Sequence, residues 1–248
     1  RLQTDYIDLY QLHWPERNTN FFGHLGYEHK DNGEWNKFED VLGNLKRFVD
    51  SGKIREVGLS NETPWGVSKY LELSKEKNLP RMMSIQNPYS LLNRTYEVGL
   101  AEISVRNQIG LLAYSPLASG FLTGKYNDGI PVDSRPTQEG YEWLIEDLEM
   151  RKKNGEVEIV RNLTSYASKI FNCTTAQLAL AWCLKNRNVS TILLGATKPE
   201  QMIENLGCIE VAEKMTEQHM SDIDEILGNK PEDWIGYGGA GPRQLRTL

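Results

Sequence analysis

The feature that most constrains this chain is a regular alternation between short apolar segments and amphipathic helical patterns. Five segments are predicted strands: the first runs from Tyr6 to His13-Trp14, and the others are Ile54–Leu59, Met82–Ile85, Gly110–Tyr114 and Ser190–Leu194. A helical pattern follows each of them. Strands that alternate with helices favour an α/β fold in which the strands form a parallel sheet.

Capping residues mark the ends of several predicted helices. Gly52 stands where a left-handed residue would end a helix, and Thr63-Pro64 is a typical start for the next one. The predicted helices cover residues 37–51, 64–77, 96–107, 155–170, 176–185, 199–206 and 217–227. Two long excursions, residues 16–36 and 118–154, account for most of the rest. We expect one domain over residues 1–248, with residues 232–248 as a flexible tail.

Composition excludes several classes of protein. The net charge of −6, without any basic block, argues against nucleic-acid binding. No apolar run reaches the roughly 18–20 residues that a membrane span requires, so no membrane insertion is expected. The three cysteines, Cys173, Cys183 and Cys208, lie far apart and lack metal-ligand spacing. We therefore expect reduced thiols, no metal site and a cytoplasmic protein.

The predicted strands end in polar and aromatic residues: His13-Trp14, Ser60-Asn61, Gln86, Tyr114-Ser115 and Gly195-Ala-Thr197. Binding sites of α/β proteins collect at the carboxyl ends of the strands. An aromatic ring supplies a stacking face, and serine, asparagine and glutamine side chains can hold a carboxamide. Each residue alone is equally consistent with a hydrogen-bonded strand end. As a set they favour a pocket for a planar heteroaromatic ligand such as nicotinamide.

A second group of residues suggests a phosphate site in the later part of the chain. In barrels, phosphates often bind at the loops after the last two strands, where helix N-terminal amides favour an anion. In chain order the group is Lys125, Arg135, Gly195, Thr197, Gln201, Glu204 and Asn205. For the last three residues, the alternative interpretation is the solvated face of a helix.

Seven segments carry a resemblance to a known family: Leu12–Pro15, Gly52–Asn61, Ile85–Asn93, Ala113–Gly120, Gly124–Tyr126, Leu193–Thr197 and Gln201–Asn205. Together they span nearly the whole chain in order, and they resemble the aldo-keto reductase superfamily. Within it, the chain is similar to the branch that holds Tas-like reductases and the β subunits of voltage-gated potassium channels. Phe21–Gly26 and Asn87–Asn93 look Tas-like, whereas Gly129–Trp143 and Leu227–Pro231 look more like the channel subunits.

The resemblance implies a (β/α)8 TIM barrel, of which this chain holds about strands 4–8, and the NADPH-dependent reduction of aldehydes or ketones. It places the active-site histidine on His13, a substrate contact on Trp14, and the nicotinamide contacts on Ser60, Asn61, Gln86 and Tyr114. It implies further NADP(H) contacts at Ser115, Leu117, Ser119, Gly120, Lys125 and Arg135 toward the phosphates and ribose. The adenosine 2′-phosphate end falls to Gly195, Thr197, Gln201, Glu204 and Asn205.

The chain departs from the family pattern at the catalytic tetrad. The family's aspartate, tyrosine and lysine belong to its first three strands, and this sequence begins at Arg1 with what looks like the fourth. Of the four catalytic positions only His13 is matched, because Lys125 corresponds to a cofactor position. We therefore expect the chain by itself to lack reductase turnover. The three missing residues would have to come from a segment upstream of Arg1.

Two other interpretations are kept. The first is a nicotinamide-binding regulatory β subunit of a potassium channel or a similar partner, which the segment Gly129–Trp143 favours and His13 disfavours. The second is the product of a degenerate gene fragment. Co-purification with a membrane protein and cofactor binding without turnover would favour the first, and failure to express as a soluble monomer would favour the second. Undetectable turnover of an aromatic aldehyde with NADPH, even in the complete protein, would exclude the reductase.

Overall fold

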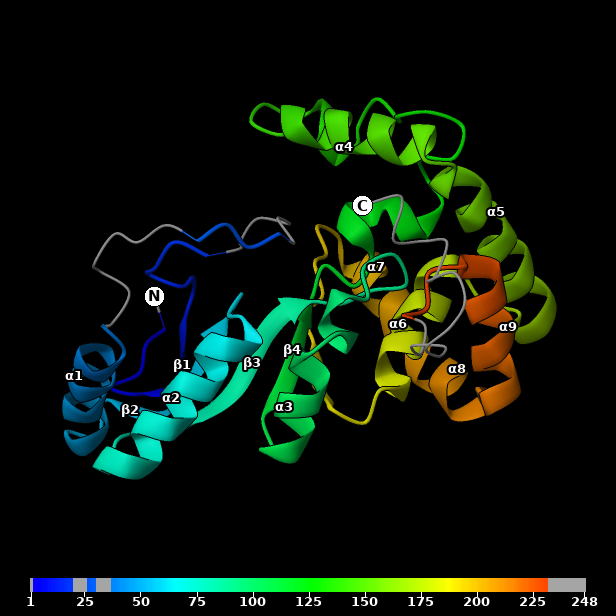
Figure 1. Cartoon of the computed structure of the whole chain (residues 1–248). Coiled ribbons are helices and arrows are strands. Elements are labelled where there is room, and N and C mark those ends of the chain that lie inside the picture. Colours follow the sequence, from blue (N-terminus) through cyan, green and yellow to red (C-terminus); the bar gives the residue numbers. More distant parts are fainter. Residues whose placement is uncertain (1, 20–25, 30–36, 232–248) are drawn as a thin grey trace.

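The computed structural model describes residues 2–19, 26–29 and 37–231. The predicted tail at 232–248 and much of the first excursion lie outside these described residues. The described strands form one five-stranded parallel sheet in the order β1-β2-β3-β4-β5 (Figure 1). Their bounds are β1 Ile7–Leu12, β2 Ile54–Ser60, β3 Met82–Pro88, β4 Gly110–Tyr114 and β5 Val189–Ile192. The prediction of an α/β fold with a parallel sheet is confirmed.

The register of the sheet brings the carboxyl ends of neighbouring strands together. Leu12 pairs with Leu59, Leu59 with Ile85, and Ile85 with Leu111. The residues that follow these positions therefore emerge along one edge of the sheet, as the polar strand ends require. Within the described residues β1 and β5 are the outer strands, so the sheet is open.

Helices lie beside the sheet and beyond it. Figure 1 shows α1, α2 and α3 along the sheet, and α5, α6, α8 and α9 gathered beyond β4, with α4 lying apart from the sheet. At least one helix lies between each strand and the next, and α7 to α9 follow β5. The bounds are α1 Phe38–Asp50, α2 Pro64–Lys77, α3 Leu100–Arg106, α4 Glu142–Lys153, α5 Glu156–Tyr166, α6 Thr175–Lys185, α7 Pro199–Leu206, α8 Cys208–Lys214 and α9 Glu217–Leu227.

The capping signals at Thr63-Pro64 and Gly52 act as predicted. The Thr63 side chain caps α2 by accepting a hydrogen bond from the Gly66 amide, and Pro64 occupies the first helical position. Thr174 caps α6 in a reciprocal arrangement with Gln177. Gly52, after α1, has φ +72°, where a side chain would strain the backbone.

The hydrophobic core joins the sheet to its helices. Among its fully buried members are Leu42 of α1, Val67 of α2, Ile85 of β3, Leu111 of β4 and Trp182 of α6. Burying a side chain of this size stabilises the fold by about 1.5–3 kcal/mol. The same contacts hold the strand ends in a fixed arrangement, which is what a site at that edge needs.

Three elements differ from the sequence predictions. The predicted helix at 96–107 is wrong as a single element, because Gly99, with φ +88°, separates a short 3-10 turn (Thr95–Glu97) from α3. The second excursion contains α4, a mostly charged helix that buries Leu144 and Leu148. α8 fills the gap between two predicted helices. Among the described residues, no helix has the length and apolar character needed to cross a membrane.

Candidate functional site

The side chain of Asn61 connects three strand ends. Its Nδ2 donates to the backbone carbonyl of His13, which follows β1, at 3.0 Å and to Ser60 Oγ at 3.0 Å. Its Oδ1 accepts from the Tyr114 hydroxyl, at the end of β4, at 2.7 Å. Burial raises the pKa of the Tyr114 hydroxyl, so that hydroxyl remains a donor. The carboxamide of Asn61 is thereby held in one orientation by groups from three strands.

The backbone of Asn61 is fixed as well. Its amide lies 3.0 Å from the Gln86 carbonyl and 3.1 Å from Asn87 Oδ1, both in β3. Ser60 Oγ donates to the same Gln86 carbonyl at 2.9 Å. These bonds keep Asn61 at φ +56°, a left-handed conformation that asparagine tolerates better than most residues. Ser60, Asn61, Gln86 and Tyr114, all predicted from sequence, are therefore brought together with His13.

His13 and Trp14 lie at the end of β1, at the rim of this cluster. The His13 side chain is exposed, and its ring centroid lies 5.3 Å from that of Trp14 at an angle of 47°. An exposed imidazole at a strand end can reach a molecule that approaches from solvent. The local geometry thus suits a hydrogen bond to a bound ligand.

The loop after β4 has an unusual backbone. Ser115, Ala118, Ser119 and Gly120 all have positive φ, at +51°, +47°, +56° and +96°. These residues turn the chain tightly, and the Ala118 amide donates to the Ser115 carbonyl at 2.9 Å within the loop. Leu117 closes the loop, since its carbonyl accepts from the Gly120 amide at 2.9 Å. Glycine suits position 120 because a side chain would strain the backbone at φ +96°.

Two cations stand beside this loop. Lys125 Nζ lies 4.9 Å from the Tyr126 ring, and the Arg135 guanidinium lies 4.5 Å from the Tyr141 ring. Desolvation and the neighbouring Arg135 charge lower the pKa of Lys125. The Tyr126 hydroxyl is buried and has no hydrogen-bond partner among the described residues. Two cations and an unpartnered hydroxyl fit a phosphorylated ligand.

The residues around the start of α7 form a separate group, most of which is exposed. Gln201 Oε1 accepts from the amides of Thr197 at 2.8 Å and Lys198 at 3.3 Å, and from the Thr197 hydroxyl at 3.2 Å. These donors are thus occupied by the helix's own side chain. Gly195, Gln201 and Glu204 are exposed, whereas Asn205 is buried. No hydrogen bond or ion pair among the described residues links this group to the strand-end cluster.

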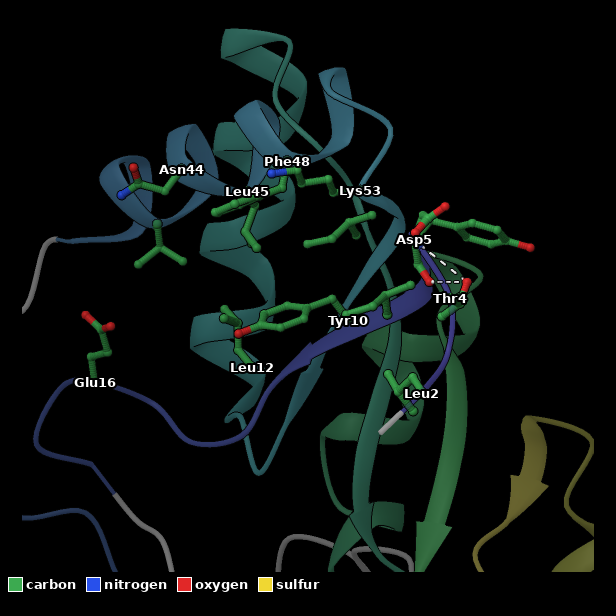
Figure 2. Close-up of a pocket in the computed structure, with 14 residues that line it drawn as sticks. Leu2, Thr4, Asp5, Tyr10, Leu12, Glu16, Asn44, Leu45, Phe48 and Lys53 are labelled. Atoms are coloured by element: carbon green, nitrogen blue, oxygen red, sulfur yellow. Dashed lines mark hydrogen bonds between the residues drawn. The ribbon is translucent and has the colours of Figure 1, made fainter.

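A cavity of about 590 Å³ lies elsewhere, between β1 and α1. Figure 2 shows Leu12 and Tyr10 on one side and Leu45 and Phe48 on the other. None of the site residues predicted from sequence lines it. Its walls are mainly apolar and lie at the outer strand of the sheet, so it is distinct from the candidate site.

One pair of residues near the site escaped sequence reasoning. Arg17, four residues after His13, makes two hydrogen bonds to the carboxylate of Glu62, which follows Asn61. The two residues are 45 positions apart and match no motif, and each is ordinary as a surface residue. The one available signal was their position directly after two polar strand ends.

Neither metal chemistry nor thiol chemistry is suggested by the described residues. They contain no group of three or more His, Cys, Asp or Glu side chains arranged to hold a metal ion. All three cysteines are free thiols. Burial raises the pKa of Cys183 well above its ordinary value, which keeps that thiol unreactive.

Comparison with known proteins identifies the class. The model of the aldo/keto reductase family matches residues 1–228. The protein called "Protein tas" from Escherichia coli (strain K12) and its counterpart from Shigella flexneri are each 41% identical to the chain over 229 residues. This chain belongs to the aldo/keto reductase family, a family of oxidoreductases that generally use a nicotinamide cofactor.

The alignment with the Tas relatives covers most of this chain but a smaller share of each relative. The alignment covers 91% of this chain and 63% of each Tas relative. The chain thus spans less than two thirds of the length of the curated relatives that it matches. Family membership confirms the resemblance seen in the sequence, and the relatives support its Tas-like side.

Proposed function

We propose that this chain forms the NADP(H)-binding part of a reductase that converts aldehydes or ketones to alcohols. The observation that carries the proposal is the Asn61 cluster, in which three strand ends hold one carboxamide. When bound, the nicotinamide cofactor supplies the hydride. In this proposal the chain supplies about strands 4–8 of a (β/α)8 barrel.

We assign the nicotinamide carboxamide to Ser60, Asn61 and Gln86, and the stacking face to Tyr114. The bond from the Tyr114 hydroxyl to Asn61 Oδ1 holds the ring and the amide in a fixed relation. Because hydrogen bonds within the protein already hold the side chains of Ser60, Asn61 and Tyr114, little side-chain entropy is lost there on binding. His13 orients the substrate carbonyl through a hydrogen bond, and Trp14 contacts the rest of the substrate.

We assign the phosphates and ribose to the loop after β4 and its two cations. Lys125 and Arg135 supply the positive charge that a pyrophosphate needs, and the buried Tyr126 hydroxyl, which has no partner among the described residues, lies next to Lys125. The residues concerned are Ser115, Leu117, Ser119, Gly120, Lys125 and Arg135. Gly195, Thr197, Gln201, Glu204 and Asn205 take the adenosine 2′-phosphate end, which favours NADP over NAD.

Carbonyl reduction also requires a proton donor. In the family this is a tyrosine whose pKa is lowered by an aspartate and a lysine, and no residue of this sequence matches those three positions. We therefore propose that the 248-residue chain binds NADP(H) without turnover, and that a protein that also contains the three residues is active.

Two measurements test the proposal. Isothermal titration of the chain with NADPH should show one site, and NADH should bind more weakly. A complete protein that contains the tetrad should oxidise NADPH in the presence of an aromatic aldehyde such as 4-nitrobenzaldehyde. Absence of NADPH binding would overturn the cofactor assignment. Binding without turnover in the complete protein would favour the regulatory subunit instead.

A further inference from the structure

Two interactions join the end of β1 to the end of β2. Asn61 Nδ2 donates to the His13 carbonyl at 3.0 Å. Just beyond, the Arg17 guanidinium donates to both carboxylate oxygens of Glu62, at 2.5 and 2.9 Å. The segments 13–17 and 61–62 therefore close a small ring. That ring contains the histidine and the asparagine on which the proposed reaction depends.

The ion pair is buried, and both of its partners also form hydrogen bonds with Thr63. The exposed fractions of the Arg17 and Glu62 side chains are 9% and 3%. Glu62 Oε1 also accepts from the Thr63 amide at 2.7 Å, and Arg17 also donates to Thr63 Oγ1 at 2.9 Å. A buried charge is tolerated when its hydrogen bonds are satisfied in this way.

The surroundings are shaped to hold this pair. A Cβ at position 66 would lie 2.2 Å from Glu62 Oε1 and 2.7 Å from an Arg17 nitrogen, so only glycine leaves room inside α2. The guanidinium carbon lies 5.3 Å from the centre of the Phe38 ring and 5.0 Å from that of Trp65. Such contacts hold the plane of the guanidinium, which in turn fixes the carboxylate.

Stability alone does not explain a buried pair. Apolar side chains of similar volume often serve as well or better, because they carry no desolvation cost. A bidentate pair adds direction, since both partners must lie in one relative orientation. Asp8 and Arg55 provide a comparison: they pair at 2.7 Å between the opposite ends of the same two strands, yet their side chains are 73% and 60% exposed.

We propose that Arg17 and Glu62 are positioning residues: their bidentate pair fixes the placement of His13 and Asn61 relative to each other. Neither residue needs to touch the substrate or the cofactor. The pair acts through the four backbone links between His13 and Arg17 and the single link between Asn61 and Glu62. The proposal rests on the function proposed above, in which His13 meets the carbonyl and Asn61 holds the carboxamide.

The test compares three variants of the 248-residue chain. Arg17→Met keeps the aliphatic stem but removes the charge. Arg17→Met combined with Glu62→Leu replaces the whole pair by apolar side chains and removes the uncompensated carboxylate. Arg55→Met is the matched control, because it breaks the exposed pair between the same two strands.

Each variant is measured in three ways: thermal unfolding, NADPH affinity, and the NMR signals of the His13 imidazole and the Asn61 side-chain amide. The His13 signal is assigned with His13→Gln, since the chain has four histidines. We expect Arg17→Met to lower the melting temperature and weaken NADPH binding about 10-fold. The double variant should regain the melting temperature while its affinity stays weak and both signals stay shifted. Arg55→Met should leave all three readouts unchanged.

The opposite result is equally clear. If the double variant regains both the melting temperature and the wild-type signals and affinity, the pair only fills space and the proposal is overturned. If the wild-type chain binds no NADPH, the proposed function fails on its own account. The His13 and Asn61 signals then decide whether the pair positions them, because they require no ligand.

Discussion

The two parts of the proposed cofactor site are built in different ways. At the strand ends, the side chain of Asn61 is bonded to His13, which follows β1, and to Tyr114, the last residue of β4, and its backbone amide is bonded to β3. At the start of α7, by contrast, Gln201 bonds residues of its own turn, and the group is exposed. One end is tied together by tertiary contacts, and the other is held by local ones.

This difference separates two ways of binding. The strand-end groups already point in fixed directions, so a ligand that matches them loses little entropy on binding. The amides at α7 already have an acceptor in Gln201 Oε1, so an incoming phosphate has to replace it. Affinity should therefore depend strongly on single side chains at the strand ends and weakly on single side chains at α7.

The largest effect is expected for Asn61→Gly. Glycine keeps the left-handed backbone but removes three side-chain hydrogen bonds. Because the variant loses both the side chain assigned to the nicotinamide carboxamide and the bonds that hold its neighbours in place, NADPH affinity should fall roughly 100-fold, as measured by isothermal titration. Asn78→Gly is the matched control, because Asn78 is also left-handed, at φ +51°, but ends α2. Unchanged affinity in Asn61→Gly would remove the basis of the comparison.

Two substitutions at Tyr114 distinguish the contribution of the ring to NADPH affinity from that of the hydroxyl. Tyr114→Phe loses only the 2.7 Å bond to Asn61 and should weaken NADPH binding about 5-fold. Tyr114→Ala also loses the stacking face, and its loss should be about 30-fold. Competitive titration against the wild-type chain measures both values. Equal losses in the two variants would assign the whole effect to the hydroxyl.

Lys125 should give NADPH binding a pH dependence. Only its charged ammonium attracts a phosphate, and its pKa lies below the ordinary value because of desolvation and Arg135. Affinity should therefore be full at neutral pH and fall as pH rises, sooner than an ordinary lysine would cause. Lys125→Met should lose about 10-fold at neutral pH. Lys125→Arg stays charged, so its affinity should be flat over the same range; a decline that persists in Lys125→Arg would point to another group.

The smallest effect is expected for Gln201→Ala. Gln201 Oε1 accepts hydrogen bonds from the amides before α7, as a helix cap does. Its loss should cost about 0.5–1 kcal/mol of folding stability, and NADPH affinity should change less than about 3-fold. Calorimetry and titration provide the two numbers. Gln218→Ala on α9, which breaks a bond to Asp222, is a matched control. A loss of affinity near that of Asn61→Gly would show that α7 is as strongly organised as the strand ends.

Much of this architecture follows from local sequence signals. Apolar runs such as Ile54–Leu59 and caps such as Thr63 act over a few residues, so their outcome is readable from the chain. Parallel strands then bring Ser60, Gln86 and Tyr114 to one edge without further information.

Other features depend on contacts between distant segments. α4 is hard to see because charged residues cover it and only Leu144 and Leu148 are buried. The Arg17–Glu62 pair exists because a loop folds over the start of α2 and Gly66 leaves space there. No periodicity encodes such a meeting. Gln201, by contrast, bonds residues three and four positions before it, but those bonds form only when the turn before α7 closes.

The left-handed residues of the loop after β4 also bear on how this protein can change. Ser115, Ala118 and Ser119 each hold a conformation that costs a non-glycine residue about 1–2 kcal/mol. Glycine would relieve this strain but would make the loop less rigid. Selection for thermal stability would therefore favour glycine at these positions, whereas selection for cofactor binding would favour the residues present. The loop is a place where the two pressures oppose each other.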